Sequence, residues 1–163
     1  MIATSLAEIH HNMTRAAKDD GRAFNDVTLI AVSKKQPDER ILEALDAGIR
    51  TFGENRVQEA QERWAVHREN YPDLKLHLIG PLQTNKSEDA VQLFDVIESL
   101  DREKLAVSLA KAMQKHSIYP ECLIQVNTGA EDQKAGIAVA DAIDFAARCR
   151  DTHGLAISGF MCI

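Results

Sequence analysis

The sequence predicts an α/β fold built around a parallel sheet. Six short apolar segments, which begin near positions 28, 51, 76, 94, 122 and 156, alternate with segments of helical periodicity. Successive starts lie 18 to 34 residues apart, which leaves room for a helix between each pair. No proline-rich or glycine-rich linker divides the chain, so residues 1–163 are expected to form one domain. Two architectures remain open on this pattern, an open doubly wound sheet and part of a (β/α)8 barrel.

The first two elements are expected to be a helix and a buried strand. Apolar residues of the N-terminal segment recur at spacings of three and four and so share one helix face: Leu6, Ile9, Met13 and Ala16. Asp19, Asp20 and Gly21 would end this helix. Residues 27–32 are rich in β-branched side chains and do not alternate between apolar and polar, which predicts a strand buried on both faces.

The next two helices are each predicted to follow a strand and to bury one apolar stripe. The first covers residues 38–47, and Gly48 suits the position after its last turn. The second follows the short strand 50–53, where Asn55 is expected to cap the helix and Gln58 to complete a capping box. The residues expected to face the core are Ile41, Leu42 and Leu45 in the first helix and Val57, Ala60 and Trp64 in the second.

The rest of the chain repeats this pattern of strand and helix. Strands are predicted at residues 75–79, 93–98, 122–126 and 156–161, because each is a short run rich in apolar residues. Helices are predicted between them over residues 85–92, from Asp101 onward, and over residues 139–149. The helix from Asp101 carries Leu105, Leu109 and Met113 on one side, at helical spacing.

Composition and charge exclude several classes of function. The net charge is −6 and only 5% of residues are aromatic, so the basic surface and stacking residues of a nucleic-acid-binding protein are lacking. No apolar run approaches the roughly 18 residues that cross a membrane, and the N-terminus lacks the features of a secretory signal. Cys122, Cys149 and Cys162 are too widely spaced for a disulfide framework or a metal pair, which favours reduced thiols in the cytoplasm.

Polar residues gather where the predicted strands end, and in parallel βα folds ligands bind at this end of the sheet. Lysines and amides predominate among them: Lys34, Lys35, Asn55, Gln83, Asn85, Lys86 and Asn127. An amide can hydrogen-bond a polar ligand without bringing charge, although asparagine is also common in caps and turns. His77 lies inside the third strand, where a histidine is more often a core residue than a ligand.

Lys34 is the most informative of these residues because it ends an apolar strand. In a partly dry pocket, desolvation lowers the pKa of a lysine amine and makes it nucleophilic toward a carbonyl, so a Schiff-base role is one interpretation. The other is that Ser33 already ends the strand and both lysines are solvated, which composition alone favours. Because Lys34 and Lys35 point to opposite faces of an extended segment, at most one of them enters a site.

Several common site motifs do not occur. There is no GxGxxG after the first strand and no GxxxxGK[ST], so dinucleotide and P-loop sites are unsupported. The sequence holds no HExxH and no cluster of histidine and cysteine, so no metal site is expected. GxSxG is also missing, which argues against a nucleophile elbow.

Five short segments, in collinear order, resemble the pyridoxal phosphate homeostasis protein family. They are LIAVSK at residues 29–34, FGENRVQE at 52–59, HLIGPLQTNK at 77–86, IQVN at 124–127 and GFM at 159–161. The resemblance implies a (β/α)8 TIM barrel of the alanine racemase N-terminal type, with about six of the eight βα units present in this chain. It also implies that Lys34 holds pyridoxal 5'-phosphate as an internal aldimine, with Asn55 and His77 around the cofactor pocket. Arg56 stands where an aromatic residue is frequent and Phe160 where leucine is usual, and neither departure affects the lysine.

The resemblance further implies a binding protein rather than an enzyme. Members of the family bind pyridoxal phosphate, buffer the free aldehyde and influence vitamin B6 balance. No catalytic residue and no partner beyond the cofactor is therefore expected, and the full-length protein is not expected to form oligomers. The phosphate-binding segments of the family would follow residue 163. We therefore expect a barrel that is incomplete at its C-terminal end, with reduced cofactor affinity and unpaired edges at the first and last strands.

Two enzymatic alternatives stay open at this point. A pyridoxal-phosphate-dependent amino-acid racemase of the alanine type would need a tyrosine opposite the lysine. Tyr71 and Tyr119 both precede proline in helix-to-strand connections, which lie at the wrong end of the barrel. A Schiff-base aldolase without a cofactor would also use a barrel lysine, and only the family resemblance disfavours it.

Overall fold

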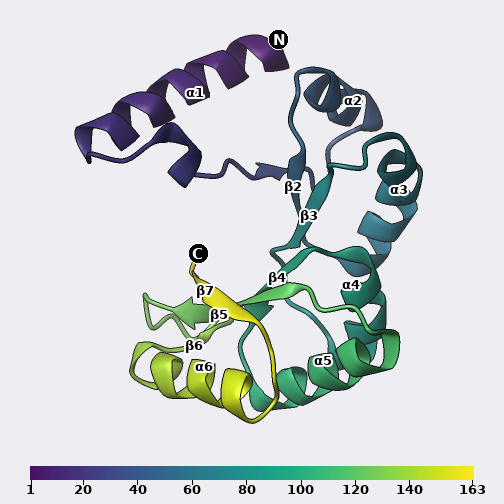
Figure 1. Cartoon of the computed structure of the whole chain (residues 1–163), viewed down its shortest axis with the longest axis vertical. Helices are drawn as coiled ribbons and strands as arrows, with labels where there is room; N and C mark the ends of the chain where they lie inside the picture. Colours follow the sequence, from purple (N-terminus) through teal and green to yellow (C-terminus); the bar gives the residue numbers. More distant parts are fainter.

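The computed structural model describes residues 1–163, in which helices alternate with strands (Figure 1). The helices are α1 (Ile2–Asp19), α2 (Asp38–Asp46), α3 (Val57–Asn70), α4 (Ser87–Leu93), α5 (Glu103–His116) and α6 (Ala142–Asp151). The strands are β1 (Ala31–Val32), β2 (Thr51–Glu54), β3 (Lys75–Leu78), β4 (Val96–Leu100), β5 (Glu121–Asn127), β6 (Ile137–Ala138) and β7 (Ile157–Met161). Three short 3-10 turns lie in the connections: η1 (Phe24–Asp26), η2 (Thr84–Lys86) and η3 (Val139–Asp141).

All strand pairs are parallel, and the strands follow one another in chain order from β1 to β5, with β7 beside β5. The short strand β6 also pairs with β5, at its carboxyl end. A doubly wound sheet reverses its strand order at a switch point, whereas sequential order is that of a (β/α)8 barrel. The sheet is therefore part of a barrel, which confirms the α/β prediction and decides between its two architectures.

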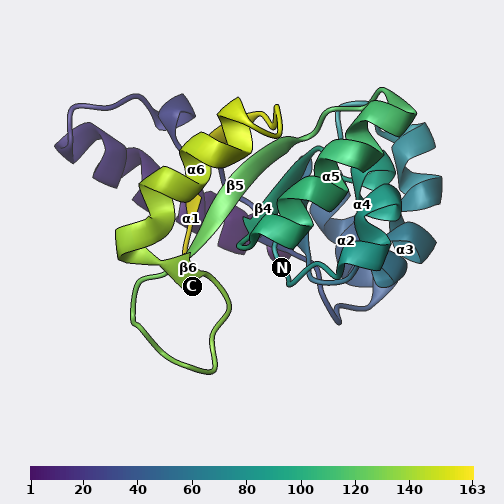
Figure 2. The ribbon, with the colours of Figure 1, turned by 90° about the horizontal axis from the view of Figure 1, so that it is seen from below.

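The strands form an arc whose outer side is covered by helices (Figures 1 and 2). Helices α2 to α6 follow the outside of the arc, and α1 packs beside α2 at the N-terminal end. Strands β1 and β7 lie at the two ends of the arc, and each pairs with one strand only, which confirms the expected edges. None of the helices combines the length and the apolar composition that crossing a bilayer would require.

The hydrophobic core lies between the convex side of the sheet and the helices. Leu76 and Leu78 of β3 are buried there together with Trp64 of α3. His77 alternates with these leucines, so it faces the concave side, as the two-residue period of a strand requires. Burying one leucine contributes roughly 1.5–3 kcal/mol. The helix-facing side of the sheet therefore carries the main hydrophobic core of the fold.

The first strand is shorter and more exposed than the sequence predicts. β1 has two residues, and Val27 and Val32 are 38% and 48% exposed. The prediction of a strand buried on both faces is therefore wrong. The reason is position, because β1 is an edge of the arc and no strand lies beyond it.

Smaller differences lie at helix boundaries and on helix faces. α3 begins at Val57 with Arg56 as its N-cap and no side-chain cap bond, so the predicted capping box of Asn55 and Gln58 is wrong. Phe94 closes the last turn of α4, since its N–H donates to the Ala90 carbonyl at 2.9 Å. This turn delays the start of β4 relative to the predicted strand. The expectation that Leu42 faces the core is also wrong, because its side chain is exposed.

Candidate functional site

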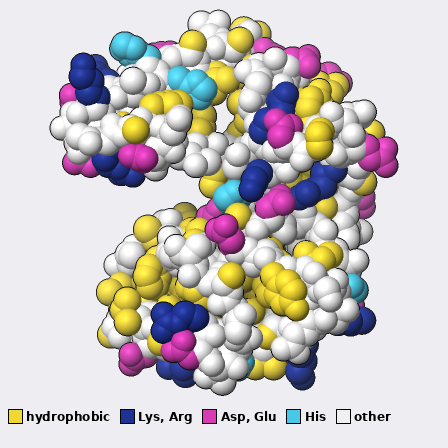
Figure 3. All heavy atoms as spheres, viewed as in Figure 1, with side chains coloured by type: hydrophobic (Ala, Val, Ile, Leu, Met, Phe, Trp, Pro, Cys, Tyr) yellow, Lys and Arg dark blue, Asp and Glu magenta, His cyan; other side chains and the backbone are white.

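The carboxyl ends of the strands surround a concave pocket of about 440 Å³. Six strand ends each contribute a residue to its wall: Lys34, Asn55, Gly80, Glu98, Asn127 and Met161. Figure 3 shows the inner side of the arc hollowed, with acidic, basic and histidine side chains meeting there. The pocket thus lies at the end of the sheet where the sequence predicts a ligand.

Lys34 lies in the tight turn that follows β1, and it lines this pocket. The Ser33 N–H donates to the Gly53 carbonyl at 3.1 Å, and the Gln36 N–H donates to the Ser33 carbonyl at 3.1 Å, which defines the turn. The expected extended segment is wrong here, because both lysines lie in the turn and Lys35 has a φ of 57°. Of the two, Lys34 lines this pocket and Lys35 lines a different surface. Lys34 is exposed, which agrees with a solvated lysine rather than with a dry pocket.

Asn55 follows β2 and is held in place through its backbone. A side chain at Gly80 has no room, because an added Cβ would lie 2.2 Å from the Asn55 carbonyl oxygen. The Ile79 N–H donates to the Glu54 carbonyl at 2.9 Å, so the strand ends of β2 and β3 stay together up to this contact. The backbone of the loop after β3 therefore packs directly against the backbone of Asn55. Asn55 lines the pocket together with Lys34.

His77 is joined to the pocket through Glu98. The His77 Nδ1 and Glu98 Oε1 atoms lie 2.6 Å apart, and both side chains are largely buried. Glu98 lines the pocket, whereas His77 lies behind it in the sheet. The pair shares one hydrogen bond whose proton position depends on the histidine tautomer. Lys34 and Asn55 thus line the same pocket, whereas His77 contacts it only through Glu98.

Gln125 is a pocket residue that the sequence analysis does not single out. It is buried in β5, and its Nε2 donates to the Ala135 carbonyl at 3.4 Å. Its Oε1 is buried without a hydrogen-bond partner. A buried polar atom of this kind costs free energy unless something binds it. The available signal is a polar residue in an otherwise apolar strand, two positions before Asn127.

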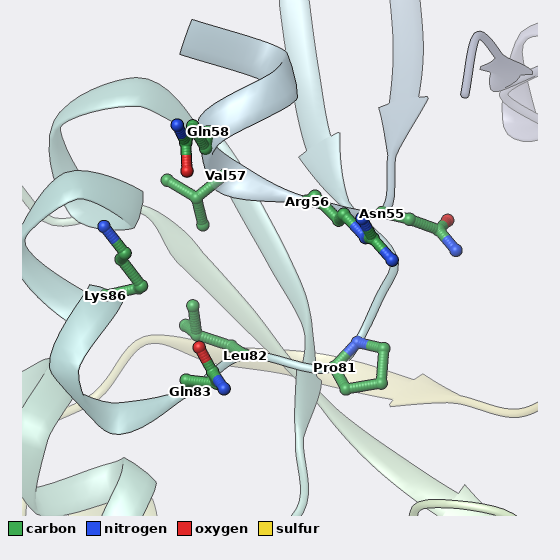
Figure 4. A pocket seen from close by; sticks show the side chains of 8 residues that line it. All are labelled: Asn55, Arg56, Val57, Gln58, Pro81, Leu82, Gln83 and Lys86. Atoms are coloured by element: carbon green, nitrogen blue, oxygen red, sulfur yellow. The ribbon is translucent and has the colours of Figure 1, made fainter. Parts of the chain in front are cut away.

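Three other candidates lie away from the Lys34 pocket. A second pocket, of about 610 Å³, opens between the start of α3 and the loop after β3 (Figure 4). Gln83 and Lys86 line this second pocket and not the first, and Asn85 lines neither. Asn55 borders both pockets, but Figure 4 shows its side chain directed away from Gln58 and Lys86.

The three cysteines are free thiols, and two of them belong to the core. Burial raises the pKa of Cys122 to about 12 and that of Cys149 to about 11. Both thiols therefore stay protonated and unreactive at neutral pH. Cys162 is exposed and lines the same pocket as Lys34.

Comparison with known proteins identifies the family. The family model described as "Alanine racemase, N-terminal domain" matches residues 4–163. The pyridoxal phosphate homeostasis protein of Vibrio cholerae is 38% identical over 164 residues, covering 99% of this chain and 70% of the relative. The chain belongs to the pyridoxal phosphate homeostasis protein family. The resemblance drawn from the five short segments is thereby confirmed.

Solved structures agree with this membership in the family. PipY of Synechococcus elongatus, in its structure with pyridoxal phosphate bound, is 38% identical with a TM-score of 0.72. The match covers 93% of this chain and 69% of PipY. Alanine racemase of Clostridium difficile is 10% identical with a TM-score of 0.70, over 95% of this chain and 39% of that one, which shows the fold alone. The predicted barrel of the alanine racemase N-terminal type is confirmed.

Proposed function

We propose that the chain binds pyridoxal 5'-phosphate through a Schiff base on Lys34 and serves in pyridoxal phosphate homeostasis. The observation that carries the proposal is the position of Lys34 at the pocket wall, at the end of the first strand. Lys134 also lines this pocket, but its Nζ lies 2.7 Å from Glu131, whereas Lys34 is in no ion pair. PipY, of which one structure holds pyridoxal phosphate, supports the choice of cofactor.

The residues of the pocket fit the aldehyde and the polar ring of such a ligand. Its volume falls within the roughly 300–1,000 Å³ typical of small-molecule sites. Asn55 and Asn127 offer neutral amides, and the unpartnered Oε1 of Gln125 can accept a hydrogen bond. When bound, pyridoxal phosphate supplies an aldehyde and an electron-withdrawing ring.

Schiff-base formation requires few steps from the residues of this chain. Lys34 would supply the amine for the cofactor's aldehyde, and the condensation would release one water molecule. The Lys34 side chain is exposed, so a ligand can reach it from solvent. Glu98 lines the pocket, and its hydrogen bond with His77 holds its carboxyl group in place.

A homeostasis role fits this pocket better than a racemase. A two-base racemase needs a second acid or base across the pocket from the lysine. Tyr71 is the C-cap of α3 and Tyr119 precedes β5, so both lie at the amino ends of the strands, opposite Lys34. Neither tyrosine lines the Lys34 pocket.

The proposal is tested by mixing the chain with pyridoxal phosphate and recording the visible absorption of a Schiff base. We expect a band that borohydride converts into a stable adduct, which peptide mass spectrometry locates at Lys34. Lys34→Ala should lose both the band and the adduct. Lys35→Ala is the matched control, because its side chain lies outside the pocket, and it should keep both.

Two results would count against the proposal. A wild-type chain without a band, or a Lys34→Ala variant that keeps it, would show that Lys34 does not hold the cofactor. Sustained conversion of L-amino acids into their D-enantiomers by the loaded protein would favour the racemase instead of the homeostasis role.

A further inference from the structure

Glu54 is a buried carboxylate on the helix-facing side of β2, beneath the turn that carries Lys34. Its Oε1 accepts hydrogen bonds from Ser33 Oγ at 2.7 Å and from Trp64 Nε1 at 2.9 Å. Burying a charge is costly unless it is paired. Arg63 supplies the pairing charge, with Nη1 at 3.1 Å from the same oxygen. Because burying a carboxylate costs free energy, packing alone does not explain why Glu54 stands at this position.

Arg63 ties α3 to both ends of the Lys34 turn. Its Nη1 donates to the Ser33 carbonyl at 2.8 Å, and its Nη2 donates to the Gln36 carbonyl at 2.9 Å. The planar guanidinium suits this forked contact, which a lysine cannot reproduce. Residues 33–36 are therefore held by a side chain from the following helix.

Besides Arg63, the turn is held by hydrogen bonds at its two ends, from Ser33 to Gly53 and Glu54 and from the Gln36 N–H to the Ser33 carbonyl, and two features work against it. β1 is an edge strand of two residues that pairs only with β2. Lys35 adopts a left-handed backbone, with a φ of 57°, which is unfavourable for a residue with a side chain. Without the contacts of Arg63, both features would let the turn move.

We propose that Arg63 and Glu54 are positioning residues that fix the Lys34 turn so that the amine faces the pocket. Neither residue lines the pocket, so both act through the turn: Arg63 through the carbonyls of Ser33 and Gln36, and Glu54 through the Ser33 hydroxyl and through Arg63. Glu54 orients Arg63, and Arg63 holds the turn. The consequence for the cofactor rests on the proposed Schiff base at Lys34, whereas the hold on the turn does not.

The test compares Arg63→Ala with Arg68→Ala. Arg68 also lies on α3 and also clamps a distant turn, since its Nη2 lies 2.6 Å from the Leu93 carbonyl and 2.6 Å from Asp95 Oδ2. We expect Arg63→Ala to speed amide hydrogen exchange in residues 33–36 of the unloaded chain. It should also weaken pyridoxal phosphate binding roughly tenfold or more, as a displaced reacting group does. Arg68→Ala should lower the melting temperature without either effect.

Two further variants separate position from charge. Arg63→Lys keeps the charge but loses the fork, so it should resemble Arg63→Ala in exchange and binding. Glu54→Gln keeps the shape and should give an intermediate effect. Unchanged exchange in residues 33–36 of Arg63→Ala, or an equal loss of cofactor affinity in Arg68→Ala, would overturn the proposal. If wild type binds no cofactor, the proposed function fails, and the exchange measurement still decides whether Arg63 holds the turn.

Discussion

Gly80 shows how closely the backbone packs at the pocket wall. A Cβ at this position would lie 2.2 Å from the Asn55 carbonyl oxygen and 2.7 Å from its Cα, and backbone atoms cannot turn aside as a flexible side chain can. Gly80→Ala should therefore displace Asn55 and lower the free energy of unfolding by about 1–3 kcal/mol in urea denaturation. Gly159→Ala is the control, since its Cβ would meet only the Leu123 side chain at 3.5 Å. Equal stability of the two variants would contradict the role of Gly80.

Single residues differ in how far the sequence alone could place them. The position of Lys34 at the pocket could be predicted, because a lysine that ends an apolar strand must lie at the carboxyl end of the sheet. The contact between His77 and Glu98 could not, since it joins residues 21 positions apart through the register of two strands. The unpartnered oxygen of Gln125 is likewise a property of its surroundings and has no signal in a motif.

At the scale of elements, ion pairs join neighbouring helices of the outer layer. Glu88 of α4 contacts Lys115 and His116 of α5. Glu103 of α5 contacts His153, which follows α6, and lies near Arg148 within it. Hydrogen bonds, chiefly from Lys115 and from His153, hold the pKa of the two carboxyls below the usual 4.5. Because the folded-state pKa is the lower one, the stabilisation is present above about pH 4.5 and is lost as the pH falls through the lowered pKa.

Removing these two carboxylates should therefore flatten the acid side of the stability curve. We expect the double variant Glu88→Gln with Glu103→Gln to melt below wild type at about pH 6 and to lose less stability on acidification to about pH 3. Melting temperatures recorded across this range provide the measurement. Glu62→Gln, at an exposed carboxylate of α3 outside these pairs, should follow the wild-type curve. Parallel curves for all three proteins would rule out the contribution of the helix pairs.

The existence and order of the elements could largely be predicted, whereas their edges could not. Apolar periodicity reports which side chains are able to be buried, and it found every helix and all strands except the two-residue β6. Apolar periodicity does not show whether a neighbouring strand or helix is present to cover these side chains. Residues 27–32 are therefore more exposed than their composition suggests. The late start of β4 has a similar cause, because Phe94 is apolar but closes a helical turn.

For the whole molecule, the pattern of alternating elements was compatible with two architectures, and tertiary order decides between them. Sequential parallel pairing from β1 to β5 produces the curvature of a barrel. Local propensity carries no information on that order, because βα units of the same composition occur in both folds. The resemblance to a family supplies the strand order, because it brings in other proteins of the same fold. The fold comparisons agree with that order.

The open ends of the arc lead to a prediction about association. Phe160 of β7 lies in register with Ile124 of β5, on the side of the sheet that faces the helices, yet it is 49% exposed. An apolar side chain on an edge strand invites pairing with another chain. We expect the 163-residue chain to self-associate with rising concentration in sedimentation velocity, and Phe160→Lys to suppress this. Ile143→Lys on α6 is the control, because Ile143 is exposed on a helix and not on an edge. If both lysine variants reduce association equally, general apolar exposure is responsible; a selective effect of Phe160→Lys places the contact on the open β7 edge.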